Sequence, residues 1–170
     1  MRLGQAYGDI LGQHDYPGTV STLMGDLTAM TAALADSLKY DGLFILQTQS
    51  DGPVSMMVVD VTSQGTLRGY ARYDEDRFSG DREIDTAVPH IMGSGHIAFT
   101  VDQGPDTERY QGITALEGAS LAECAQSYFR QSEQLETAIL LAADTTSKRA
   151  AALMIQKMPE IDVKQTTKGL

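Results

Sequence analysis

Residues 43–73 read LFILQTQSDGPVSMMVVDVTSQGTLRGYARY, and this stretch decides the fold class. Three β-competent segments, residues 43–49, 54–61 and 66–73, are separated by the turn sequences SDGP and TSQG. Gly, Pro, Asp and Ser favour tight turns, and short connections favour antiparallel neighbours. The stretch therefore predicts a three-stranded antiparallel meander.

An amphipathic helix is predicted just before this meander. Apolar residues recur at spacings of three and four from Val20 to Leu38, which places them on one stripe of a helix. Thr19 or Ser21 can supply the N-cap oxygen, and Asp41-Gly42 is expected to end the helix. One face of this helix must pack against the rest of the protein.

Shorter elements are predicted after the meander. A capping box at Ser120–Glu123 predicts a helix whose apolar stripe includes Cys124. The other expected elements are an exposed acidic loop at 74–85, a short helix within 84–92, strands at 95–101 and 108–116, and a hairpin of 137–143 with 151–157. Strand groups with helices between them predict an α+β fold, mainly antiparallel sheets packed with a few helices in a single core domain.

Composition and charge argue against several functions. The chain of 170 residues has 13 basic and 23 acidic residues, a net charge of -10. Nucleic-acid binding usually needs a basic face, so no nucleic-acid partner is expected. No apolar run resembles a signal peptide or a membrane span. We therefore expect no membrane association and a cytoplasmic location.

Metal, redox and nucleotide sites are not indicated by the motifs. Cys124 is the single cysteine, so it can form no internal disulfide, and its place on an apolar stripe predicts a buried thiol. The three histidines show no paired metal-ligand spacing. Gly93-Ser94-Gly95 lacks the third glycine of a dinucleotide loop and the lysine of a phosphate loop. No cofactor is therefore expected.

Two kinds of candidate site remain. Glu108 and Glu117, with Asp102 and Asp106, lie near strand ends and could form an acid–base pair, so a hydrolase or small-ligand domain is one alternative. The other candidate is apolar surface. Residues 56–59 are four large apolar residues in one strand, and alternation sends Met57 and Val59 to the same face. We predict that Met57 and Val59 are exposed positions on a surface that accommodates varied partners.

Several segments, in this order and at these spacings, together resemble the family of the thirty-three-kilodalton heat-shock protein, a redox-regulated bacterial holdase chaperone. The segments are HDYP at 14–17, KYDG at 39–42, SDGP at 50–53, LRGYAR at 67–72, ERYQG at 108–112, LEG at 116–118, YF at 128–129 and SEQL at 132–135. The resemblance covers most of the chain.

The resemblance implies a chaperone that binds unfolding proteins, its clients, without ATP and without catalysis, so Met57 and Val59 would be exposed client-binding positions. It also implies a homodimer that exchanges elements between its subunits. In such proteins a linker and a small zinc domain follow the core. Four cysteines there, in CxC and CxxC pairs, hold zinc until oxidation releases it and exposes the client-binding surface.

The chain departs from this pattern because the CxC and CxxC cysteines are absent. The expected organisation is therefore a chaperone core at 1–158, the start of a linker at 159–170, and no zinc domain, as in a truncated fragment. Cys124 matches none of the zinc ligands. A further alternative is that the core only dimerises and serves as scaffold, while the linker makes most client contacts.

Overall fold

The computed structural model describes residues 1–79 and 87–158. The elements in chain order are β1 (Arg2–Leu3), α1 (Gln5–Gly12), α2 (Gly18–Asp36), β2 (Leu43–Ser50), β3 (Val54–Thr62), β4 (Leu67–Tyr73), α3 (Glu75–Phe78), α4 (Val88–Ile91), β5 (Gly95–Asp102), β6 (Tyr110–Ala115), α5 (Leu121–Tyr128), the π-helix η1 (Phe129–Glu133), β7 (Thr137–Asp144) and β8 (Arg149–Gln156).

The strands form two antiparallel sheets. The large sheet has the order β4-β3-β2-β5-β6, and the small sheet has the order β1-β8-β7. Both predicted connections of the meander are present, since β3 pairs with β2 on one side and with β4 on the other. The predicted closing hairpin is β7–β8. The α+β prediction for a single domain is confirmed.

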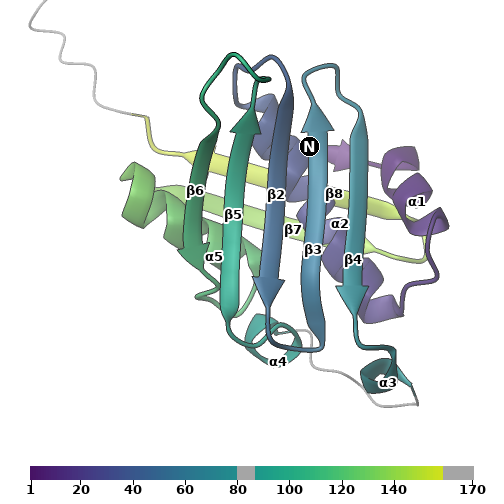
Figure 1. Cartoon of the computed structure of the whole chain (residues 1–170). Coiled ribbons are helices and arrows are strands. Elements are labelled where there is room, and N and C mark those ends of the chain that lie inside the picture. The colour runs from purple at the N-terminus through teal and green to yellow at the C-terminus, as the bar shows by residue number, and fades with distance from the viewer. Residues whose placement is uncertain (80–86, 159–170) are drawn as a thin grey trace, which may run out of the picture.

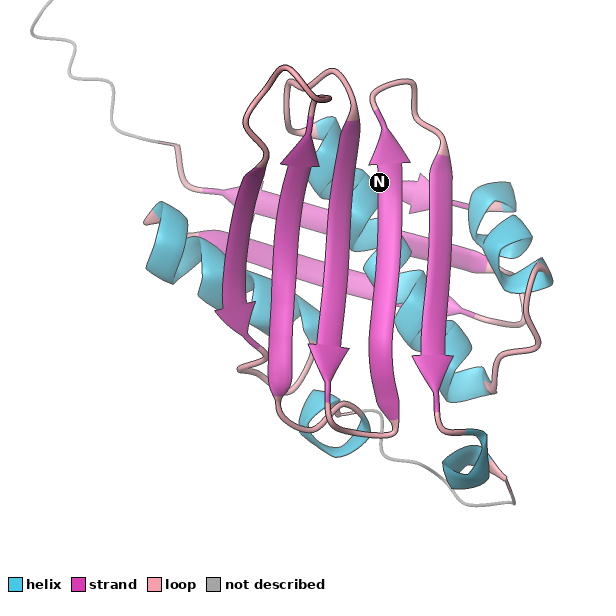
Figure 2. Cartoon of the chain, viewed as in Figure 1, coloured by secondary structure: helices cyan, strands magenta, loops and turns pink. Residues whose placement is uncertain are grey.

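Helix α2 lies between the two sheets, as Figure 1 shows: the large sheet is in front, and β7 and β8 cross behind it. The helix contacts β2, β3 and β4 on one side and β7 and β8 on the other. Figure 2 shows that, among the described residues, no helix covers the front of the large sheet. The molecule therefore has three layers, with a central helix and two sheets.

The two sides of α2 differ in side-chain size. Large residues, including Leu23, Met24 and Leu27, join the main core with the large sheet. On the other side, Ala29 is buried in a second cluster with Ala150 and Ala152 of β8. A Cβ atom on Gly25 would lie 2.6 Å from the Cβ of Ala143. Small residues on both partners thus let the helix approach the small sheet closely.

Helix boundaries differ in part from the prediction. Helix α2 begins at Gly18 with Pro17 as N-cap and no side-chain cap, so the predicted caps at Thr19 or Ser21 are wrong. The helix ends at Asp36, earlier than expected, and the hydroxyl of Ser37 donates to the carbonyl of Leu34. Tertiary packing of both its faces stabilises this long helix, which offsets the missing side-chain cap.

The capping box of α5 forms nearly as predicted. The amide of Glu123 donates to the Oγ atom of Ser120 at 3.2 Å. The carboxylate of Glu123 accepts from the amide of Ala119 at 2.7 Å, one residue before the cap. The predicted loop at 74–85 contains α3, and its residues 80–85 lie outside the described residues.

Asp26 is a half-buried acid on α2 whose ionisation should make stability depend on pH. Burial raises its pKa from 3.8 to about 6. Between about pH 4 and pH 6 the folded state holds a proton that the unfolded state has lost, so stability falls as the pH rises through this window and stays lower above it. Asp26→Asn should raise the free energy of unfolding at pH 7.5 by about 1–2 kcal/mol, after allowance for partial solvation.

Urea denaturation between pH 4 and pH 8 measures this effect. The Asp26→Asn variant should show a flatter pH dependence than the parent protein. A parent protein whose stability rises across this window would contradict the prediction.

Candidate functional site

The outer face of the small sheet is apolar, and no described residue outside the sheet covers it. Alternation along β7 and β8 turns Ile139, Ala150 and Ala152 inward, where they are buried. The residues that point outward are almost all apolar. We call this set the apolar face: Ala138, Leu140, Ala142, Ala151, Leu153 and Ile155.

The large side chains of the apolar face lie exposed next to one another. Leu140 is opposite Leu153, and Ala138 is opposite Ile155 in the β7–β8 register. Leu140, Leu153 and Ile155 are 67%, 54% and 61% exposed. Neighbouring pairs across a hairpin are within contact distance. These residues therefore form one contiguous patch.

The outer face of the large sheet is different because polar side chains interrupt it. Asp60 accepts from Arg68 at 2.9 Å on this face, and Arg72 lies opposite Met56. Gln47 lies between Val58 and Ala98 in the central row. An ordinary soluble surface carries such a mixture, so the apolar face of the small sheet is the unusual surface.

Polar groups frame the apolar face at both ends of the hairpin. At the β-turn, Asp144 accepts from Ser147 at 2.7 Å, and hydrogen bonds from Ser147 and the amide of Thr146 hold its pKa below the usual value. At the open end, Lys157 and Glu136 approach to 3.6 Å. An apolar centre inside a polar rim is typical of a protein-binding surface.

One edge of the small sheet is closed by a side chain and the other is short. The amide of Ile139 in β7 donates to Gln126 of α5 at 2.7 Å. On the other side, β1 pairs with β8 only through Arg2 and Leu3, besides the bonds between Met1 and Ala152.

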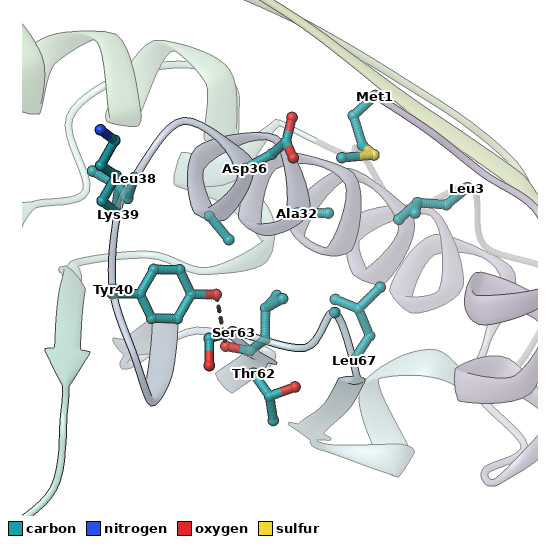
Figure 3. Close-up of a pocket in the computed structure, with 13 residues that line it drawn as sticks. Met1, Leu3, Ala32, Asp36, Leu38, Lys39, Tyr40, Thr62, Ser63 and Leu67 are labelled. Atoms are coloured by element: carbon teal, nitrogen blue, oxygen red, sulfur yellow. Dashed lines mark hydrogen bonds between the residues drawn. The ribbon is translucent and has the colours of Figure 1, made fainter.

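A cleft of 510 Å³ opens beside β1, and Figure 3 shows Met1, Leu3 and Leu67 around it.

The predicted client-binding residues Met57 and Val59 lie elsewhere. Both are fully buried in the main core. The amide of Met57 donates to the Oγ1 atom of Thr48, which is buried too. The prediction that Met57 and Val59 are exposed was wrong because α2 covers their face of β3, and alternation leaves Met56 and Val58 on the outer one.

The strand-end carboxylates do not form an acid–base pair. Glu108 and Glu117 lie at opposite ends of β6, a strand of six residues that spans about 20 Å. Asp102 instead pairs with Arg109. Hydrogen bonds from the amide of Gly104 and from Arg109 hold the pKa of Asp102 below its usual value. The pair of Asp102 and Arg109 therefore stabilises the exposed loop between β5 and β6.

Cys124 is buried, as predicted from its place on the apolar stripe of α5. Burial, with a smaller contribution from the Glu123 carboxylate, raises the pKa of its thiol to about 11. Within residues 1–79 and 87–158, no group of three or more metal-ligating side chains comes together. In the same ranges, no helix is long and apolar enough to cross a membrane.

The sequence carries a signal for apolar strands at the apolar face, although it does not say which of their faces is exposed. Residues 138–143, AILLAA, and residues 150–155, AAALMI, are uninterrupted apolar runs on either side of a turn. A strand with apolar residues at consecutive positions must present some of them on each face. As in residues 56–59, alternation gives these strands two apolar faces, and no second layer of the described chain covers the outer one.

Comparison with known proteins places the chain in a family. Residues 1–169 match the sequence model of the family described as Hsp33 protein. The chain belongs to this family.

Several relatives carry the name 33 kDa chaperonin. The protein of Caulobacter vibrioides is 43% identical over 164 residues, covering 92% of this chain and 54% of its own length. The proteins of Shewanella loihica and Ectopseudomonas mendocina are 41% and 40% identical, covering 95% and 92% of this chain and 54% and 51% of their own lengths. The chain spans about half the length of these relatives.

A solved structure has the same fold. The crystal structure of the 33 kDa chaperonin of Thermotoga maritima, a heat shock protein 33 homologue, superposes with a TM-score of 0.70 at 20% identity. The match covers 89% of this chain and 53% of that one.

Proposed function

We propose that this protein is a holdase chaperone core that binds unfolding proteins through the apolar face and so prevents their aggregation. The observation that supports the proposal is the contiguous exposure of Leu140, Leu153 and Ile155 in the small sheet. Kinship with proteins named 33 kDa chaperonin supports the same function.

The physical basis is the hydrophobic effect. Apolar burial is not directional and scales with area, so one apolar face can bind many unfolded sequences. Burying a leucine side chain stabilises a complex by roughly 1.5–3 kcal/mol. The net charge of -10 keeps the protein and its complexes apart in solution.

On this proposal the protein acts by binding alone, without ATP, a cofactor or catalysis, in the cytoplasm. Its partners are unfolded or partly folded proteins, not nucleic acids or membranes. The family resemblance implies that oxidative activation depends on zinc-binding CxC and CxxC cysteines, which this sequence does not contain. The expected linker at 159–170 lies outside the described residues.

Light scattering tests the proposed function. The protein, added in stoichiometric amounts to a heat-unfolding client such as citrate synthase, should suppress aggregation equally with and without peroxide. Cys124→Ala should behave in the same way, because the buried thiol has a raised pKa and little reactive thiolate. Strong dependence on the oxidant would contradict the proposal, as would no suppression under either condition.

We further propose that the protein forms a homodimer in which the two copies exchange β1, as the family resemblance implies. Strand β1 contacts β8 through Arg2 and Leu3, besides the bonds between Met1 and Ala152. A strand that is held by so few contacts can pair with β8 of a second copy in the same way. The cleft of 510 Å³ beside β1 would then lie next to the interface.

Sedimentation velocity measures this assembly. A dimer is expected at about 50 µM, and removal of residues 1–3 should shift it to monomer because the exchanged strand β1 is lost. Monomers of the parent protein at every concentration would contradict the dimer.

A further inference from the structure

A second cavity, of 360 Å³, lies between the end of α2, the large sheet and the α5–η1 segment. Its walls are mostly aromatic and aliphatic, with Phe44, Phe99 and Phe129 among them. Such a volume fits a small organic molecule. The apolar face takes no part in this cavity, so the cavity can have a function of its own.

The polar groups of the cavity form one hydrogen-bonded cluster. The Oε1 atom of Glu133 accepts from the hydroxyl of Tyr110 at 2.7 Å and from that of Tyr128 at 3.1 Å. The two hydroxyls lie 3.0 Å apart. Burial and these hydrogen bonds raise the pKa of Tyr128, so its hydroxyl remains a donor. We call this set the tyrosine–glutamate cluster.

The local structure is adapted to hold this cluster. The Tyr128 ring stacks on Phe99 with centroids 4.1 Å apart. A Cβ atom on Gly112 would collide with the Tyr128 hydroxyl, so only glycine leaves it room. The π-helix η1 ends at Gln134 in a left-handed conformation with φ 52. Single π-helical turns are frequent at functional sites.

Three of the sequence segments on which the family resemblance rests meet at this cavity. Tyr110 and Gly112 belong to ERYQG, Tyr128 belongs to YF, and Glu133 belongs to SEQL. The proposed client binding uses none of these segments. Their convergence therefore needs another explanation.

The charges around the cavity favour a cation. Among the described residues that line it, Glu133 is the one charged residue and none is basic. Both tyrosine hydroxyls donate to Oε1. No hydrogen bond from a described residue reaches the Oε2 atom. Aromatic faces and a carboxylate together attract an ammonium group.

We propose that this cavity binds an organic ammonium ion with an apolar body. The ammonium group donates to Oε2 of Glu133 at the rim, and the apolar body lies against Phe44, Phe99 and Phe129. A free arylalkylamine and a lysine side chain next to an aromatic residue share this chemistry.

Titration with 4-phenylbutylamine, followed by amide chemical shifts and by calorimetry, tests the proposal. The amine should bind at least about fivefold more tightly than 4-phenylbutanol, a ratio in keeping with a carboxylate and aromatic rings at a partly exposed site. The shifts should be centred on Gly112 and Glu133. Equal affinity for the amine and the alcohol would overturn the proposal, as would shifts centred elsewhere.

Glu133→Gln keeps an acceptor for both tyrosines and removes the charge. It should abolish the preference for the amine while affinity for the alcohol stays within about twofold. The matched control is Glu136→Gln, an exposed carboxylate that lines no part of the cavity and lies beside Lys157. The proposal fails if the Glu133→Gln variant retains the preference or if the Glu136→Gln variant loses it.

A parallel titration with acetyl-Phe-Lys-amide separates the two sources of the ammonium group. Shifts at Gly112 with this peptide identify a polypeptide ligand, and shifts with the free amine alone identify a small molecule. Aggregation suppression by the Glu133→Gln variant should equal that of the parent protein, so failure of the cavity proposal and failure of the holdase proposal are distinguishable.

Discussion

The double substitution Leu140→Thr, Leu153→Thr is expected to raise the amount of protein needed for half-maximal suppression of client aggregation by at least about tenfold. The two side chains face each other across β7 and β8 and are both more than half exposed. Each leucine lost from a bound complex costs roughly 1.5–3 kcal/mol if it is fully buried there. Because Leu140 and Leu153 are neighbours, their two contributions to the free energy of client binding need not add.

Stability should change little in this variant. Threonine has a high β-propensity, and exposed substitutions usually alter the free energy of unfolding by about 0.5 kcal/mol or less. Thermal denaturation followed by circular dichroism, next to the light-scattering assay, measures both properties. Loss of suppression with an unchanged melting temperature would assign the effect to binding.

The matched control is Ile113→Thr. Ile113 is 56% exposed and points outward from β6 in the large sheet, so it is similar in size, exposure and secondary structure. It lies outside the apolar face. We expect full suppression by this variant. Equal losses in both variants, or none in the double variant, would show that clients bind somewhere other than the apolar face.

Met57→Ala should destabilise the protein by about 2–4 kcal/mol, because it removes a fully buried side chain from the main core and leaves a cavity. For a domain of this size the melting temperature should fall by roughly 4–16 °C. Met56→Ala changes the adjacent residue on the outer face of the same strand. It should cost less than about 1 kcal/mol.

This pair of variants also tests the corrected orientation of β3. If Met57 were a client contact, alanine there would reduce aggregation suppression and leave the melting temperature almost unchanged. The structure leads to the opposite expectation: stability falls, and below the new melting temperature suppression is retained. Thermal denaturation, with light scattering at about 10 °C below the melting temperature of the Met57→Ala variant, distinguishes the two results.

The sequence alone predicted most of the local structure. Turn residues at 50–53 and 62–65 and β-branched residues between them specify the meander, because these preferences act over a few residues. The capping box at Ser120–Glu123 and the buried role of Cys124 followed from local patterns in the same way. The family resemblance, drawn from short segments, agrees with the match over residues 1–169.

The choice of exposed face was decided only by the tertiary structure. Two strands carry apolar residues at consecutive positions, residues 56–59 and residues 138–143. Alternation gives each of these strands two apolar faces and does not indicate which face is exposed. Helix α2 covers Met57 and Val59 from one side and Ile139 from the other, whereas nothing among the described residues covers Leu140. Which faces are covered depends on how layers stack, and stacking is a long-range property.

The same distinction applies to α2 and to the cavity. The sequence showed a large apolar stripe from Val20 to Leu38, yet Gly25 and Ala29 gave no sign that they would pack against β7 and β8, because small residues carry little hydrophobic signal. Tyr110 and Glu133 likewise meet only after the chain folds. The sequence determined the elements and the family; the packing of two sheets on one helix determined which surface is left to bind.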